Sequence, residues 1–218
     1  MDIYWGGQAL FKLKGKYASV IIDPFDPTYT GLKLPKDLTA NLVLLSHEHE
    51  DHGNSDVVTA PDGKKPMVFK EPGEYEVSGV VVSAINSFHD NTNGSERGKN
   101  LIFHIMIDGL NILHLGDLGQ SELTEEQLSQ IGQVDILLVP VGSVYTINSK
   151  AASNIVSQLE PKIIIPMHYK IEDLKFELEG VEGFLKEMGA EGVVALPKLS
   201  VTKDKLPEEP QVVLLSKS

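Results

Sequence analysis

The chain has 218 residues, of which 41% are hydrophobic and 23% are charged. This balance is typical of a folded globular protein and excludes disordered and fibrous classes. The chain has no cysteine, which excludes a disulfide scaffold, an iron–sulfur cluster, a thiolate zinc site and a cysteine nucleophile. Its formal net charge of −12 repels nucleic acid and anionic membrane surfaces. We therefore expect no nucleic-acid partner, and any metal must be held by His, Asp or Glu.

The N-terminus carries no recognisable export signal. The opening residues MDIYWGGQAL lack the basic segment and apolar stretch of a signal peptide. No apolar run approaches the ~20 residues of a spanning helix. We expect a cytoplasmic protein with no membrane span. The basic run Lys12–Lys16 is interleaved like one face of a strand, and we interpret it as a solvated strand edge.

Short apolar segments in the first half of the chain predict strands. Asp108–Gly109 lies between two of them and is a strong signal for a two-residue hairpin. The predicted strands are Ile3–Trp5, Ala9–Leu13, Tyr17–Ile22, Asn41–Leu45, Met67–Lys70, Val77–Phe88 (broken by Gly79), Leu101–Ile107 and Leu110–Leu115.

The second half alternates strands with helices. Thr124 and Gln127 form a capping box that begins a helix ending at Gly132. Asn148 or Ser149 begins another, with apolar residues at helical spacing until Pro161. The other predicted elements are the helix Val181–Met188 and the strands Asp135–Val139, Lys162–Ile165, Val193–Leu196 and Val212–Leu215. Since no linker divides these elements, we expect one domain over residues 1–218, with two packed sheets and helices outside.

The most informative segment is Ser46–Gly53, with the sequence SHEHEDHG, directly after an apolar strand. In an extended turn, His47 and His49 lie on one side, whereas Asp51 and His52 turn toward a second point. This arrangement favours two neighbouring cations over one.

Three further candidate ligands, His89, Asp117 and His168, each follow the C-terminal end of an apolar strand. Loops at strand ends can converge on one rim, so we expect these residues to join the His47 motif. His104 and His114 lie within predicted strands instead. We interpret both as core or supporting residues rather than ligands.

Two more residues lie on the same expected rim. Asp23 is placed to hydrogen-bond a ligand imidazole, although an Asx turn before Pro24 explains it equally well. Tyr145 could orient a substrate or simply pack against its neighbours. Two divalent cations held by two carboxylates leave a positive local charge, which suits an anionic or carbonyl-bearing small-molecule substrate.

Taken in order, these motifs resemble the metallo-β-lactamase superfamily. The matching segments are Ile3–Gln8, Ile22–Pro24, His47–His52, His89, Gly116–Asp117 and Pro166–His168. The chain is most similar to compact metal-dependent hydrolases related to ascorbate-6-phosphate lactonase and to N-acylphosphatidylethanolamine phospholipase D. Many of those relatives carry His at the position of Gln8, so no catalytic role is carried over to this residue.

The resemblance implies an α+β fold, a four-layer αββα sandwich with a dinuclear site at one edge. It also implies a ligand set in two halves bridged by Asp117: His47, His49 and His89 for one metal, and Asp51, His52 and His168 for the other. The implied reaction is hydrolysis of an ester-like bond (phosphodiester, lactone or carboxylic ester) by a metal-bridging hydroxide, with Asp51 as catalytic proton acceptor. We expect two divalent metal ions, zinc first, with manganese or iron as alternatives.

Two other functions stay open. One is an iron-dependent dioxygenase on the same fold, although His49 disfavours the flavodiiron branch, where Glu typically replaces it. The other is a metal-binding module without turnover, which the complete ligand set disfavours. An RNA-processing nuclease is disfavoured by the net charge of −12. The substrate and the oligomeric state cannot be predicted, which leaves a homo-oligomer open.

Overall fold

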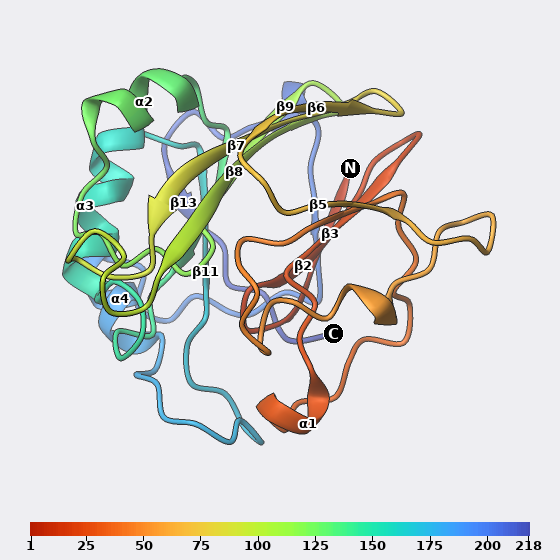
Figure 1. The fold of residues 1–218 in the computed structure, drawn as a ribbon. Coiled ribbons are helices and arrows are strands. Elements are labelled where there is room, and N and C mark those ends of the chain that lie inside the picture. Colours follow the sequence, from red (N-terminus) through yellow and green to blue (C-terminus); the bar gives the residue numbers. More distant parts are fainter.

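The computed structural model describes residues 1–218 and contains two mixed β-sheets (Figure 1). The six-stranded sheet has the order β12 (Leu199–Ser200), β1 (Asp2–Gly7), β2 (Leu10–Lys14), β3 (Ser19–Ile22), β4 (Leu42–Leu44) and β5 (Met67–Phe69). The seven-stranded sheet has the order β13 (Gln211–Val212), β11 (Ile163–Met167), β10 (Ile136–Pro140), β9 (Leu110–His114), β8 (Lys99–Ile107), β7 (Val80–Phe88) and β6 (Gly73–Val77).

The helices are unevenly distributed between the two sheets. Figure 1 shows α2 (Glu125–Ile131), α3 (Ser149–Leu159) and α4 (Glu182–Glu187) along one side of the seven-stranded sheet. The short α1 (Pro27–Thr30) lies apart from them, near the six-stranded sheet. Two 3-10 helices complete the structure, Ser55–Val57 and Lys203–Lys205. None of the helices has both the length and the apolar character that crossing a membrane requires.

Apolar side chains that alternate between the two faces of a strand contribute to two hydrophobic cores. In β3, Val20 and Ile22 belong to the large core that both sheets share, whereas Ile21 belongs to a smaller one. Successive side chains of a strand point to opposite faces, so the smaller core covers the outer face of the six-stranded sheet. The parallel strands β10 and β11 are buried throughout, as their continuous apolar sequences predict.

Local signals account for several element boundaries. Asp108 and Gly109 have φ of 51° and 77° and join β8 to β9, which confirms the predicted hairpin. The Thr124 capping box at α2 is present, and the Asn148 side chain accepts from the Ala151 N–H at the start of α3. Both predicted helix starts are therefore confirmed.

The predicted strands differ from the structure in two places. The segment Val77–Phe88 is interrupted by a turn at Ser78–Gly79, as predicted, but the strand before the turn, β6, begins at Gly73 rather than at Val77. The predicted strand Val193–Leu196 is wrong, because only Leu196 forms an isolated bridge there and Val194 is 78% exposed. The pairing edge of β1 is taken instead by β12.

Candidate metal centre

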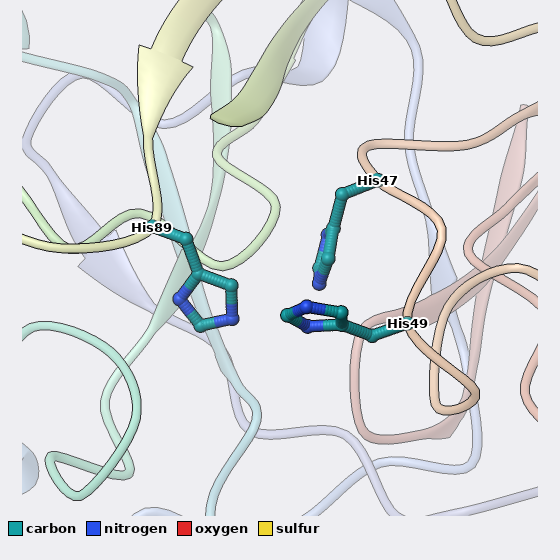
Figure 2. A group of neighbouring side chains, drawn as sticks. All are labelled: His47, His49 and His89. Atoms are coloured by element: carbon teal, nitrogen blue, oxygen red, sulfur yellow. The ribbon is translucent and has the colours of Figure 1, made fainter. Parts of the chain in front are cut away.

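The predicted ligands lie where four strands end. The loop after β4 carries His47, and His89 follows β7 directly. Asp117 lies three residues beyond β9, and His168 follows β11 directly. Figure 2 shows the His47–His49 loop on one side and His89 opposite, with the three imidazoles directed at one another. The convergence of strand-end loops expected from the sequence is therefore present.

Seven donor residues form two groups. Within each group, the donor atoms lie within 4.8 Å of one another. The groups are His47, His49 and His89, and Asp51, His52, Asp117 and His168. The spacing of the His47–His52 motif predicts the same division of the donors between two neighbouring cation positions.

One carboxylate oxygen joins the two groups. Asp117 Oδ2 lies 3.3 Å from His89 Nε2, 3.1 Å from His52 Nε2 and 3.3 Å from His168 Nε2. His89 belongs to the first group and the other two imidazoles to the second. Asp117 is therefore placed to serve both groups at once.

Asp23 and Ser46 orient two of the imidazoles. Asp23 Oδ2 lies 3.0 Å from His52 Nδ1 and accepts from the Ser46 hydroxyl at 2.7 Å. With its proton directed to Asp23, Ser46 Oγ accepts from His47 Nδ1 at 2.9 Å. Both imidazoles then carry their protons on Nδ1, which leaves the Nε2 atoms free for a metal. The predicted hydrogen bond from Asp23 to a ligand imidazole is thus present.

Burial and charge set the protonation of the cluster. Burial lowers the pKa of His47 well below its usual value. Burial alone would raise the pKa of Asp117, but the charges of His168 and His52 outweigh burial and lower this pKa well below its usual value. Burial alone would also lower the pKa of His52, but Asp117, Asp51 and Asp23 together raise it well above the usual value. The neutral His47 and ionised Asp117 are the forms that bind metals, and the carboxylates around His52 attract positive charge.

Unpartnered buried atoms show that the donor set fits divalent cations. His47 Nε2 and Asp117 Oδ1 are buried and have no hydrogen-bond partner in the protein. An unsatisfied buried polar atom costs about 1–3 kcal/mol, and coordination would satisfy both. Imidazole and carboxylate donors without thiolates suit zinc, manganese or iron.

The family comparison agrees with this geometry. A family model described as a beta-lactamase superfamily domain matches residues 2–168. The chain belongs to the metallo-β-lactamase superfamily. A UPF0173 metal-dependent hydrolase of Thermoplasma acidophilum is 30% identical over 194 residues, which cover 80% of this chain and 85% of the relative.

Solved structures of the superfamily have the same fold. A candidate zinc-dependent hydrolase of the metallo-β-lactamase superfamily from Thermotoga maritima matches with a TM-score of 0.79 and 37% identity, over 98% of this chain and 97% of its own. The metallo hydrolase Igni18 of Ignicoccus hospitalis shares the fold, with a TM-score of 0.66 and 18% identity over 92% of this chain and 99% of its own. The expected sandwich fold is confirmed, and the chain falls among the metal-dependent hydrolases of this superfamily.

Strained backbone surrounds the metal centre of this superfamily member. Gln8, Asp23 and His168 have φ of 50°, 47° and 51°. Left-handed backbone at such residues costs about 1–3 kcal/mol each and clusters at functional sites. The Gln8 carbonyl accepts from Trp5 Nε1 at 2.7 Å and from the His168 N–H at 3.2 Å. These bonds hold two of the three strained residues against each other.

Asp90 holds the loop that follows His89. Its carboxylate accepts from the N–H groups of Thr92, Gly94, Glu96 and Arg97 at 2.8 to 3.0 Å. Burial alone would raise the pKa of Asp90, but these donors lower it. Sequence reasoning missed this residue, although an Asp followed by a polar, glycine-containing segment is the usual pattern of a side chain capping a loop.

Gln8 reaches the metal centre, which the sequence left undecided. Its side chain is fully buried, and its Nε2 lies 3.4 Å from His168 Nε2. Its Oε1 has no partner. The amide of Gln8 therefore has an unsatisfied acceptor next to the candidate ligand His168.

Tyr145 lies in an aromatic group with Phe176 and Tyr29. Its ring is 6.0 Å from that of Phe176, which is 5.8 Å from that of Tyr29. Arg97 lies over the Tyr145 ring at 5.6 Å. Burial raises the pKa of Tyr29, and the negative charges of Asp51 and Glu50 raise it further.

The two remaining histidines lie outside both donor groups. His114 is buried, its Nε2 bonds the Ala9 carbonyl at 2.9 Å, and its Nδ1 accepts from the Gly116 N–H at 3.0 Å. His104 lies on β8, half-buried, and burial lowers its pKa. The structure thus places both where the sequence predicts, within strands.

Proposed function

We propose that this protein hydrolyses an ester-like bond in a small anionic substrate at a dinuclear metal site. The observation that carries the proposal is the convergence of seven donors in two groups around Asp117 Oδ2. His47, His49 and His89 would hold one cation, and Asp51, His52 and His168 the other, with Asp117 shared. Two divalent cations there would lower the pKa of a coordinated water and polarise the bond under attack.

Asp51 is the proposed proton acceptor. Its carboxylate lies 3.6 Å from both His52 Nε2 and His168 Nε2. Burial alone would raise the pKa of Asp51, but the charge of His52 and the proximity of both imidazoles outweigh burial and lower this pKa. An ionised Asp51 can take a proton from the attacking water, a role that typically contributes about 10²–10⁴-fold to the rate.

Arg97 and Tyr145 are the proposed wall of the substrate site. Arg97 is positively charged, and its guanidinium donates to the Val144 carbonyl at 3.3 Å, next to the Tyr145 ring. A cation beside the site would attract an anionic group, and the rings of Tyr145 and Phe176 offer apolar contact to the rest of the molecule.

Metal content and hydrolysis together test this function. The protein would be purified without a His tag or chelator, and its metals counted by plasma mass spectrometry. Turnover would be measured on bis(p-nitrophenyl) phosphate, a γ-lactone and p-nitrophenyl acetate. We expect about two zinc or manganese ions per chain, and activity that Asp51→Asn lowers about 10²–10⁴-fold. His104→Ala is the control, since it removes an imidazole outside both donor groups.

The alternatives give different results. One iron per chain with oxygen uptake would indicate the dioxygenase instead. Full metal content without hydrolysis of any of the three bond types would support a binding module. Absence of metal even after reconstitution would overturn the dinuclear site itself.

A further inference from the structure

A cleft of about 540 Å³ lies on the outer face of the six-stranded sheet, away from both donor groups. Strands β1 and β2 form one wall, and the segment Lys33–Leu38 forms the other. Its volume is in the range of ~300–1,000 Å³ usual for small-molecule sites. Tyr4, Leu10, Leu34 and Leu38 supply its apolar lining.

Five lysines line the same cleft: Lys12, Lys14, Lys33, Lys36 and Lys217. Among them only Lys12 forms an ion pair, with Asp37 Oδ2 at 2.6 Å. This pair fastens the Lys33–Leu38 segment to β2. The other four have no acidic partner within 4.0 Å, in a chain whose 31 acidic residues outnumber its 19 basic ones. Lys12 and Lys14, interpreted from the sequence as a solvated strand edge, thus lie in the wall of a cleft.

Only part of the positive charge of this cleft is balanced within the protein: Lys12 pairs with Asp37, and Lys217 Nζ donates to the Ser218 backbone oxygen at 3.5 Å. Burial lowers the pKa of Lys217, Asp173 opposes this effect, and the nearby ammonium group of Lys33 lowers the pKa further. Like charges held close together over an apolar surface are stabilised when an anion binds between them. The apolar lining has no counterpart to cover it, so the complementary ligand has an apolar body as well as a negative charge.

We propose that this cleft binds a small amphipathic anion, with its carboxylate or phosphate head between Lys33 and Lys217 and its aliphatic body on Leu34 and Leu38. The site is separate from the proposed hydrolysis and does not depend on it. Such a ligand is bound rather than chemically changed in this cleft, because the lining contains no histidine and its one carboxylate, Asp37, is paired with Lys12.

Calorimetric titration of the metal-containing protein with decanoate tests the site. We expect 1:1 binding of decanoate. Acetate, which lacks the aliphatic chain, and methyl decanoate, which lacks the negative charge, should each bind about tenfold more weakly or worse. Lys33→Glu should weaken decanoate about tenfold or more by replacing an attraction with a repulsion. Lys16→Glu is the matched control: it makes the same charge change at an exposed lysine outside the cleft lining.

Equal weakening by Lys16→Glu and Lys33→Glu would show only a response to net charge and would overturn the site. Undetectable decanoate binding would overturn it as well. Because a metal centre can also bind carboxylates, the titration is repeated with Asp117→Ala. Binding that survives Asp117→Ala and fails in Lys33→Glu supports the cleft, and the reverse pattern assigns decanoate to the metal centre. Retention on phosphatidylglycerol vesicles without 1:1 decanoate binding would indicate a lipid surface and contradict a small-molecule site.

Discussion

At the scale of single residues, the histidines differ in how their ring nitrogens are used. His114 bonds the backbone with both nitrogens, so neither is free for a metal. His47 bonds Ser46 through Nδ1, and its buried Nε2 has no partner. A buried nitrogen without a partner is costly unless something binds it. The same side chain is therefore structural in β9 and a candidate ligand after β4.

Substitution of Asp117 should reduce the binding of both metals, whereas substitution of His168 should reduce the binding of one. Asp117→Ala removes the oxygen that lies within 3.3 Å of imidazoles from both groups, so we expect the content of both metals to fall. His168→Ala should lower the content from about two ions to about one, because His168 belongs to one group only. Plasma mass spectrometry of folded protein measures both. Unchanged metal content in His168→Ala would refute its assignment.

His114→Ala should lower the stability of the fold without removing the metals. The substitution leaves the Ala9 carbonyl and the Gly116 N–H without their side-chain partner, so the free energy of unfolding should fall by about 1–3 kcal/mol. Most of the metal should be retained, since His114 belongs to neither donor group. Denaturant unfolding and metal analysis on the same sample check this, and complete loss of metal would show that His114 is a ligand.

At the scale of elements, Asn100 joins the strand ends that carry the site. It lies on β8 and is fully buried. Its Nδ2 donates to Ser87 Oγ at 2.7 Å and to the Leu115 carbonyl at 2.9 Å, and its Oδ1 accepts from the Asp117 N–H at 2.9 Å. Gly116 makes room for this arrangement, since a Cβ there would collide with Asn100 Oδ1. One side chain therefore ties β7 and β9 together and positions Asp117.

Asn100→Ala should weaken both the fold and the site. Three hydrogen bonds are lost and buried backbone groups are left unpaired, so we expect the free energy of unfolding to fall by about 2–4 kcal/mol. Metal content should fall in the folded protein as well. Asn86→Ala is the control: Asn86 is exposed on β7, and surface changes of this kind stay within about 0.5 kcal/mol. Equal effects of the two substitutions would contradict this role of Asn100.

The secondary-structure elements and the candidate metal ligands could be predicted from local sequence patterns, whereas the residues that hold those ligands in place could not. The capping box at Thr124 and the Asp108–Gly109 turn are short-range signals, and both predictions are confirmed. Asn100 and Ser46 act through hydrogen-bond partners on other strands. A single sequence considered by itself does not show which strands become neighbours. The predicted strand Val193–Leu196 failed because edge pairing with β1, rather than propensity, selects the residues that join the sheet, and β12 takes that edge.

At the scale of the whole molecule, each sheet contributes to the metal centre. The first sheet carries Asp23 and the His47–His52 loop, and the second carries His89, Asp117 and His168. The donors therefore meet at the junction of the two sheets. That the 218 residues form one domain stays a prediction. A ligand shared between the two sheets acts as a cross-link, since unfolding must release it.

Removing the metals should therefore lower the stability of the whole fold. At a free metal concentration about 100-fold above the dissociation constant, binding adds ~2.7 kcal/mol to the free energy of unfolding. For a chain of this size, that corresponds to a melting temperature about 5–10 °C higher. Thermal unfolding with and without a chelator measures the difference, and adding zinc back should restore the higher value.

The variant Asp117→Ala provides the control for this stabilisation. If the cross-link acts through the shared carboxylate, the chelator should change its melting temperature by much less than that of the unsubstituted protein. Lys16→Glu should retain the full response, because Lys16 is exposed and belongs to neither donor group. A chelator effect of equal size in all three proteins would place the stabilising metal outside the candidate centre, and the two sheets would then be held together by their shared hydrophobic core and by direct hydrogen bonds such as His114–Ala9.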